Sequence, residues 1–189
     1  MLVVDTSDFE PSIEAVEREA TLKGFMKAFL GGSETGINEG RVQVALITFN
    51  THPEVVFDLG QLKTANALMD AIDDAEFLPG ERNTADALGL IRSKILRFDR
   101  PNIPNVVLLL TTGKSDRNSF RTLQEADALK YARTSIFTVG INLDTDGEVE
   151  LNEIASKPTA ENTFLLRSFY ELEIMKDVLF HQIFSSEYL

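Results

Sequence analysis

The stretch PNVVLLLTTG, residues 104–113, decides how this chain folds. Its centre, Val106 to Leu110, is apolar at every position, so it lacks the alternation of a half-exposed strand. A strand that is apolar on both faces belongs in the middle of a parallel sheet covered by helices. A proline and a glycine bound the run, and two threonines follow it directly. The stretch therefore predicts a central strand that ends in a polar loop.

Helical and strand patterns alternate on both sides of this run. The patterns predict strands at 2–4, 41–49, 54–58, 135–141 and 163–166, and helices at 12–30, 62–75, 84–98, 119–132, 148–155 and 169–184. A short turn separates strands 41–49 and 54–58, so these two should form a hairpin. The alternation predicts an α/β fold: a doubly wound, mostly parallel central sheet with one antiparallel edge strand and helices on both faces, a Rossmann-like arrangement. Residues 1–189 are expected to form a single domain.

The composition narrows the classes of function. The chain has 189 residues, a net charge of −12 and no cysteine. The acidic balance argues against nucleic acid or an anionic membrane as partner, and no apolar run reaches the roughly 18 residues that cross a bilayer. No glycine-rich phosphate loop follows the first strand, no Gly-x-Ser-x-Gly elbow is present, and thiol catalysis is unavailable. The sequence therefore predicts a protein that is not an enzyme.

Polar residues with metal-binding chemistry follow the first predicted strand. Ligands of doubly wound sheets bind beyond the carboxyl ends of the strands, where the strand order reverses. The loops expected there are residues 5–9, 80–84 and 111–115. Asp5 and Ser7 lie two residues apart just past a buried strand, and such a carboxylate and hydroxyl suit a divalent cation in a hard oxygen site.

Several segments, taken in order, resemble the von Willebrand factor type A domain, the module also found in integrins, matrilins and collagen VI. The resembling segments are VDTS (4–7), which is similar to the start of the family's Asp-x-Ser-x-Ser motif, VQVALITF (42–49), RNTADAL (82–88), LLLTTGK (108–114) and IFTVG (136–140). The resemblance covers essentially the whole chain. It implies a protein-binding role in adhesion or in the extracellular matrix, with a partner such as collagen or another matrix protein. The chain starts almost inside its first strand, so we expect it to be part of a multidomain protein.

Three positions depart from the family's metal-ion-dependent adhesion site. In the family, five side chains surround a magnesium or manganese ion, and Asp5 and Ser7 match two of them. The resemblance expects a serine, a threonine and an aspartate where this chain has Phe9, Arg82 and Thr112. A guanidinium repels a dication, and a hard cation site needs about six oxygens. We therefore expect no metal and no other cofactor, with Arg82 donating hydrogen bonds to Asp5 instead.

A different set of metal ligands is an alternative. Thr84 lies two residues beyond Arg82 and could swing toward Asp5 and Ser7, with Thr112 or Asp8 also contributing. A residual magnesium or manganese site at Asp5 and Ser7 would then make adhesion metal-dependent.

The predicted function is protein–protein recognition or adhesion without a metal ion. The residues expected to form its binding loops are Asp5, Ser7, Phe9, Arg82, Thr84, Thr112 and Lys114, and contacts through a lateral helix face are an alternative. Arg82, Lys114 and Arg117 could together receive an acidic group of the partner. Two further interpretations remain: a structural unit of a multidomain matrix protein, and an intracellular scaffold of the same family.

Overall fold

A six-stranded sheet in the order β3-β2-β1-β4-β5-β6 runs through the centre of the protein. The structure is a computed structural model that describes residues 1–32 and 35–184. The strands are β1 (Leu2–Asp5), β2 (Leu46–Phe49), β3 (Pro53–Phe57), β4 (Asn105–Thr111), β5 (Thr134–Ile141) and β6 (Thr163–Leu166). Neighbouring strands are parallel except β2 and β3, which form an antiparallel hairpin at one edge. The predicted mixed sheet with one antiparallel edge strand is confirmed.

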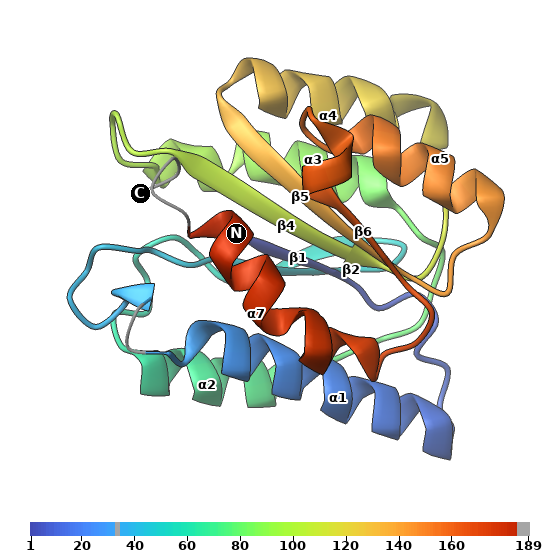
Figure 1. Cartoon of the computed structure of the whole chain (residues 1–189), viewed down its shortest axis with the longest axis horizontal. Helices are drawn as coiled ribbons and strands as arrows, with labels where there is room; N and C mark the ends of the chain where they lie inside the picture. Colours follow the sequence, from blue (N-terminus) through green and yellow to red (C-terminus); the bar gives the residue numbers. More distant parts are fainter. Residues whose placement is uncertain (33–34, 185–189) are drawn as a thin grey trace.

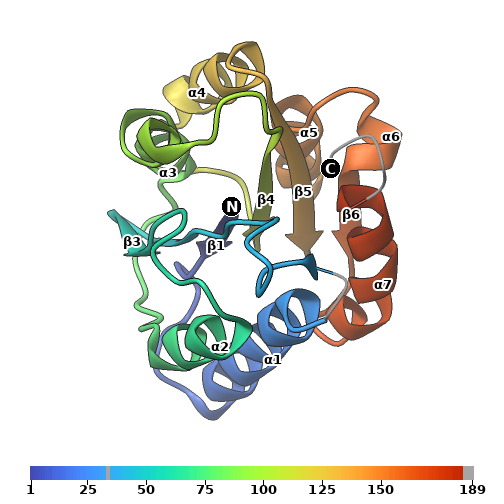
Figure 2. The same cartoon turned by 90° about the vertical axis from the view of Figure 1, so that its left-hand side faces the viewer.

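Helices cover both faces of the sheet (Figures 1 and 2). One face carries α1 (Ile13–Leu30), α2 (Ala65–Asp74) and α7 (Glu171–Ile183), and the other carries α3 (Thr84–Ser93), α4 (Thr122–Tyr131) and α5 (Thr145–Ile154). A one-turn helix, α6 (Thr159–Asn162), precedes β6. Among the described residues, no helix combines the length and apolar character needed to cross a membrane.

The apolar run in β4 is buried on both sides, as predicted. Leu108 and Leu110 belong to the hydrophobic cluster under α1, α2 and α7. Val107 and Leu109 belong to the cluster under α3 and α4. Because successive side chains of a strand point to opposite faces, an uninterrupted apolar run is what a strand between two helical layers requires.

The strand order reverses between β1 and β4. β1 pairs with β2 on one side and with β4 on the other. The chain leaves β1 toward α1 on one face of the sheet, and it leaves β4 toward α4 on the opposite face (Figure 1). The switch point at which doubly wound sheets bind their ligands therefore lies beyond Asp5 and Thr111, the last residues of these two strands.

Two predicted elements are shorter than the sequence pattern indicates. The strand predicted at 41–49 begins only at Leu46, because β1 begins at Leu2 and pairs it with Leu46, which leaves the preceding residues without a strand partner. The helix predicted at 84–98 ends at Ser93, and a 3₁₀ turn over Ile95–Phe98 follows it. The backbone of Lys94, with φ −120° and ψ −56°, interrupts the α-helical geometry.

Other helix boundaries also differ from the prediction. Helix α5 begins at Thr145 instead of 148, because Asp144 caps it by accepting a hydrogen bond from the Gly147 backbone N–H at 2.8 Å. Helix α1 begins at Ile13, because Ser12 is its cap and accepts a hydrogen bond from the Ala15 backbone N–H. The helix predicted at 119–132 begins as a 3₁₀ turn over Ser119–Arg121. The sequence pattern did not predict α6.

Candidate functional site

The side chain of Arg82 lies against the end of β1. Its Nε donates a hydrogen bond to Asp5 Oδ2 at 2.5 Å, and the Asp5 side chain has no solvent exposure. Arg82 belongs to the loop before α3, far from Asp5 in the sequence. The hydrogen bond predicted between these two residues is therefore confirmed.

The remaining acceptor positions of Asp5 are also engaged. Its Oδ1 accepts hydrogen bonds from the Ser7 backbone N–H at 2.9 Å and from Ser7 Oγ at 2.6 Å. Its Oδ2 accepts a second hydrogen bond from Thr111 Oγ1 at 2.7 Å, and the Thr112 backbone N–H lies 3.3 Å away. A carboxylate offers about four lone-pair sites, so the hydrogen bonds saturate Asp5.

The guanidinium of Arg82 joins the three loops that lie beyond the carboxyl ends of the strands. They are called here the first loop (residues 5–9), the second loop (80–84) and the third loop (111–115). Its Nη2 donates to Asp8 Oδ2 at 2.8 Å and to Thr112 Oγ1 at 3.1 Å. Its Nη1 donates to the Lys114 carbonyl oxygen at 3.2 Å. Thr112 Oγ1 also donates to Asp8 Oδ2 at 2.6 Å, which closes the network. The first and third loops are thus bound to one cation supplied by the second.

Two hydrogen bonds hold the second loop beside the first. Thr6 Oγ1 donates to the Leu78 carbonyl at 3.0 Å. The Gly80 backbone N–H donates to the Ser7 carbonyl at 3.1 Å. These contacts place the loop that carries Arg82 over the end of β1.

The third loop fits around the backbone and side chain of Arg82. The Arg82 carbonyl accepts hydrogen bonds from the backbone N–H groups of Asp116 at 3.1 Å and Arg117 at 3.2 Å. Gly113 lies directly against the guanidinium: a Cβ atom added there would lie 2.5 Å from Arg82 Nη1. The absence of a side chain at Gly113 therefore lets the guanidinium lie against the third loop.

The electrostatic environment keeps Arg82 protonated. Burial by itself lowers the pKa of Arg82, because it disfavours the charged form. The charge of Asp5, the hydrogen bond to Asp5, and the charges of Asp8 and Asp116 outweigh this effect and raise the pKa above its usual value. Arg82 is thus a permanent cation at this position.

The arrangement of donors and acceptors does not fit a hard divalent cation. Magnesium prefers about six oxygen ligands at roughly 2.1 Å. Here both oxygens of Asp5 already accept hydrogen bonds, and one of them faces a positive charge at 2.5 Å. Among the residues that the structure describes, no group of three or more acidic or histidine side chains converges in a way that could hold a metal.

Phe9 belongs to the core and does not face Asp5. Only 5% of the residue is exposed. Its ring contacts Phe77 and Phe169 edge to face, with centroid distances of 5.1 and 6.4 Å. The Arg18 guanidinium carbon lies 5.8 Å from the centre of the Phe9 ring. Where the family's motif places a serine, this chain has an aromatic residue that fastens the first loop to the loop between β6 and α7.

The other predicted site residues lie nearby but make different contacts. Thr84 is buried at the first position of α3, and none of the hydrogen bonds within the described part of the chain joins it to Asp5. Lys114 Nζ lies 3.3 Å from Asp146 Oδ2, and Arg117 Nη1 lies 2.5 Å from Glu81 Oε2. Each cation predicted to receive an acidic partner group therefore already has an acidic neighbour.

The resemblance did not point to Thr111 or to the pairing of Asp8 with Arg82. Thr111 is the last residue of β4, and its hydroxyl donates a hydrogen bond to Asp5. In the sequence, Thr111 indicates only where the apolar strand ends. Asp8 could have been found as the remaining acid of the first loop, because a second carboxylate suits a guanidinium with free donors.

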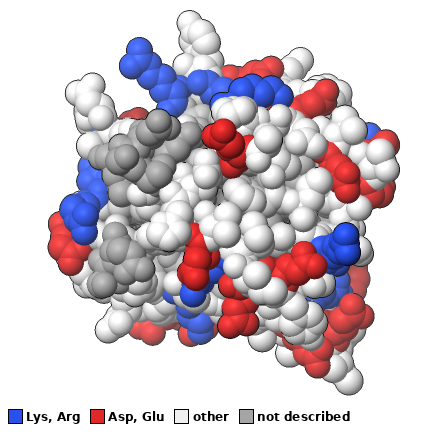
Figure 3. All heavy atoms as spheres, in the orientation of Figure 1, with Lys and Arg blue, Asp and Glu red and all other residues white. Residues whose placement is uncertain are grey.

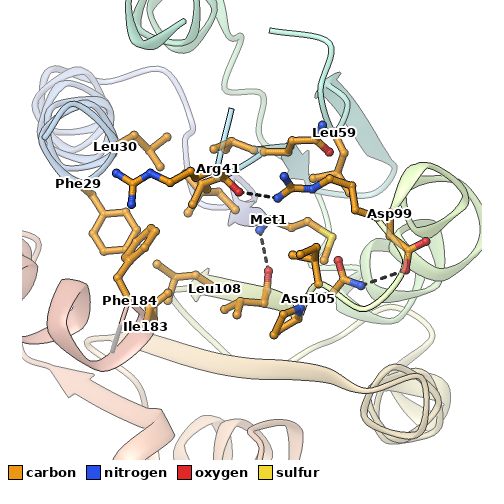
Figure 4. Close-up of a pocket in the computed structure, with 18 residues that line it drawn as sticks. Met1, Phe29, Leu30, Arg41, Leu59, Asp99, Asn105, Leu108, Ile183 and Phe184 are labelled. Atoms are coloured by element: carbon orange, nitrogen blue, oxygen red, sulfur yellow. Dashed lines mark hydrogen bonds between the residues drawn. The ribbon is translucent and has the colours of Figure 1, made fainter. Parts of the chain in front are cut away.

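A separate cavity of about 400 Å³ lies at the opposite, amino-terminal end of the sheet (Figure 4). Phe29, Leu30, Ile183 and Phe184 contribute to its apolar wall. The Met1 amino group donates to the Val106 carbonyl at 2.6 Å, and burial lowers the pKa of that group to about 5. None of the residues 5–9, 80–84 and 111–115 lines this cavity.

Comparisons with known proteins identify the family of this chain. The family model of the von Willebrand factor type A domain matches residues 1–177. The collagen alpha-4(VI) chain of Mus musculus is 28% identical over 170 residues, which cover 87% of this chain and 7% of the relative. Cuticlin-6 of Caenorhabditis elegans is 30% identical and matrilin-1 of Gallus gallus 29%; the matches cover 75% and 70% of this chain, and 24% and 27% of those proteins.

Solved structures share the fold. Proximal thread matrix protein 1 from the mussel byssus superimposes with a TM-score of 0.84 at 22% identity, over 96% of this chain and 46% of that one. A further structure of that protein, with a zinc occupied MIDAS motif, has a TM-score of 0.82 at 22% identity and covers 96% and 47% of the two chains. The pilus adhesin SpaC from Lactobacillus rhamnosus GG has a TM-score of 0.75 at 17% identity, over 96% and 30%. The sheet order, the loop positions and the family match together place this chain in the von Willebrand factor type A domain family.

Proposed function

We propose that this chain is a non-enzymatic protein-recognition module that contacts its partner without a metal ion. The observation that carries the proposal is the hydrogen bond from Arg82 Nε to the buried carboxylate of Asp5, at the position where the family binds its ion. A family member with an intact site lets a partner's carboxylate complete the coordination of the metal. Here the guanidinium takes the place of the metal cation, and its N–H groups donate hydrogen bonds to groups of the same chain.

The partner is proposed to be a matrix protein, such as a collagen, and the setting extracellular. The relatives of this chain include collagens and a matrilin, which are matrix proteins. Acidic and basic side chains are interspersed on the face drawn in Figure 3, and the net charge is −12. This charge distribution disfavours nucleic acid and anionic membranes, both of which require a broad basic surface.

The surface of contact is proposed to lie on the loops around Asp5, Ser7, Phe9, Arg82, Thr84, Thr112 and Lys114, or on a lateral helix face. Arg82 mainly holds the loops together and has little charge left for a partner, because its side chain is only 10% exposed and already pairs with Asp5 and Asp8. An acidic group that docked on Lys114 or Arg117 would have to compete with Asp146 or Glu81. A lateral surface with unpaired cations is therefore the better place for such a group.

An affinity experiment tests the proposal. The chain is immobilised, a solubilised matrix extract is passed over it in EDTA and then in magnesium, and retained proteins are identified and quantified against a blocked surface. The proposal predicts the same proteins, retained to the same extent, in both buffers. Retention that requires magnesium would reject metal independence, and no retention above the blocked surface would reject recognition of matrix proteins.

A structural role in a longer chain is the second candidate. The matched regions make up only 7%, 24% and 27% of three matrix or cuticle relatives, so each matched region is a small part of a longer protein. We propose residues 1–189 as one such unit. In this role the module would self-associate without a dedicated ligand, which sedimentation equilibrium would detect as a dimer or higher oligomer.

A further inference from the structure

A second pocket, lined mainly by charged and polar residues, lies between α1 and the loop that joins β6 to α7. It has a volume of about 380 Å³ and is called here the α1–α7 cleft. Its lining residues are Glu14, Glu17, Arg18, Thr21, Ile141, Asn142, Arg167, Ser168, Phe169 and Tyr170. The start of α1 and the start of α7 lie side by side in Figure 1. The cleft lies to the side of the Arg82 network and shares none of its residues.

Two arginines of this cleft have no carboxylate partner. Arg18 and Arg167 take part in none of the ion pairs found among residues 1–32 and 35–184. By contrast, Arg82, Lys114 and Arg117 on the loops beyond the sheet are all paired. Within the described part of the chain, the cleft therefore offers two cations that no carboxylate pairs, unlike these three.

Arg18 also has an unsatisfied buried donor. Its Nε is shielded from solvent, and no hydrogen-bond acceptor reaches it within the described part of the chain. Its guanidinium carbon lies 5.8 Å from the ring centre of Phe9 and 6.0 Å from that of Phe169. These rings hold the guanidinium in place through cation–π contact but accept no conventional hydrogen bond from it. An unsatisfied buried donor is costly, and an acceptor from outside the chain, either water or a ligand, would remove that cost.

The remaining charges of the cleft select the kind of acceptor. Glu14 and Glu17 line the side formed by α1 and balance the two arginines. A phosphate or a sulfated chain, with two or more negative charges, would be repelled by these glutamates. A single carboxylate adds only one negative charge and matches the planar fork of an arginine. Ser168 and Tyr170 also line the cleft, and their hydroxyl groups are further hydrogen-bond donors.

An exposed apolar stripe leads away from the cleft along α7. Tyr170, Ile174 and Val178 are spaced at i, i+4 and i+8, and they are 74%, 76% and 51% exposed. Residues at this spacing lie on one face of a helix. A stripe of large apolar side chains beside a charged cleft suits a polypeptide that carries apolar residues next to an acidic one.

From these observations we infer that the α1–α7 cleft binds an Asp or Glu side chain of a protein partner, with apolar neighbours of that residue packed on the stripe formed by Tyr170, Ile174 and Val178. The inference rests on the proposed role in protein recognition and names the chemistry that the partner presents. Arg18 and Arg167 hold the carboxylate, and the stripe contacts the residues beside it. The site needs no metal ion.

Nuclear magnetic resonance with short capped peptides tests the cleft without knowledge of the partner. The probes are acetyl-Leu-Glu-Leu-amide and its glutamine counterpart, titrated into the folded chain at millimolar concentration. The glutamate peptide is expected to shift the Arg18 Nε–H resonance and the backbone amides of Ser168 and Tyr170 in a saturable way. The glutamine peptide should shift them little, because a neutral amide gains no charge-assisted hydrogen bonds.

Three variants separate the cleft from general charge effects. R167Q removes an exposed arginine and should weaken binding of the glutamate peptide roughly tenfold. R18K keeps the charge at Arg18 but lacks its fork, so it should also weaken binding. R97Q removes an exposed arginine outside the cleft and should leave binding unchanged.

Several results would overturn the inference. These are the absence of a saturable shift, equal shifts with both peptides, and affinity that R167Q and R18K leave unaltered. Tighter binding of inorganic phosphate, titrated in parallel, would assign the cleft to a different anion. A failed peptide titration leaves the retention of matrix proteins in EDTA untouched, so failure of this inference and failure of the proposed function are distinguishable.

Discussion

Arg82 compensates the negative charge of a carboxylate that solvent does not reach, which is the role a bound cation has elsewhere in the family. The Asp5 side chain has no exposure and that of Arg82 only 10%. A paired buried carboxylate is stable only while its partner is present, because an isolated buried charge is strongly unfavourable. The stability of the loops beyond the sheet therefore depends strongly on this pair.

Truncation of Arg82 should destabilise the protein strongly. R82A leaves Asp5 buried without its cation, and we expect a loss of about 3–5 kcal/mol in the free energy of unfolding. The stability of R82K should lie between that of R82A and that of the natural chain, because an ammonium keeps the charge but cannot reach Asp5, Asp8 and Thr112 together. Urea denaturation measures the difference, with R97A as an exposed control expected within about 0.5 kcal/mol of the natural chain. A loss below about 1 kcal/mol in R82A would contradict the role given to Arg82.

Truncation of Phe9 should also be costly, although the family has a serine at this position. Its ring packs against Phe77 and Phe169 and is 5% exposed. F9A is expected to lower the free energy of unfolding by about 3–5 kcal/mol, the range for large core aromatics. The same urea titration measures this loss. An effect like that of a surface substitution would show that the first loop does not depend on the ring.

The sequence predicted part of this site and missed part of it. The pairing of Arg82 with Asp5 could be predicted because the resemblance aligned a cation with a metal position. The contribution of Thr111 and the close approach of Gly113 depend on side-chain directions at the end of β4, which no spacing in the sequence specifies. The unpaired state of Arg18 could not be predicted either, since it follows from which acids happen to lie within reach.

At the scale of elements, local pattern and tertiary context contribute differently. β4 was predictable because its apolar run is itself the signal. The first half of the strand predicted at 41–49 was not, because Val42 and Val44 have strand-like side chains but no strand beside them. The end of α3 at Ser93 likewise depends on the backbone conformation of Lys94 and not on a helix-breaking residue.

The packing of α3 against α4 includes a carboxylate that should make the protein sensitive to acid. Glu125 accepts hydrogen bonds from Arg121 at 2.9 Å and from Arg92 at 3.0 Å. Burial alone raises the pKa of Glu125, but the hydrogen bonds from Arg121 and Arg92 and the charges of both arginines outweigh it and lower the pKa below its usual value. Folding is therefore coupled to loss of a proton at this residue.

The sign of the pH dependence follows from this shift. A carboxyl whose pKa is lower in the folded state stabilises the protein above the unfolded pKa, about 4.3 for glutamate, and this stabilisation is lost as the pH falls through the folded pKa. E125Q should therefore be less stable than the natural chain at pH 7, and its stability should fall less steeply below about pH 4.3. Urea titrations across this range measure both curves. Parallel curves would show that Glu125 does not carry the coupling.

At the scale of the whole molecule, the fold is that of the type A family, and we propose that its ion site is changed. The sheet order and the matched residues 1–177 are those of the type A family. A structure of the same fold is known with a zinc occupied MIDAS motif, and we propose that the side chains of this chain, and not its fold, decide whether an ion binds. The proposed recognition without ions therefore depends on Phe9, Arg82 and Thr112 and not on the architecture.

The response of the melting temperature to magnesium, manganese, calcium and zinc tests this proposal most directly. A specifically bound ion at about a hundred times its dissociation constant adds about 2.7 kcal/mol, which raises the melting temperature of a domain of this size by roughly 5–10 °C. We expect no rise for the natural chain beyond that given by sodium chloride of equal ionic strength. The variant F9S/R82T/T112D, which restores the family's ligand types, is expected to gain a rise if it folds. A saturable rise for the natural chain that EDTA reverses would contradict the account.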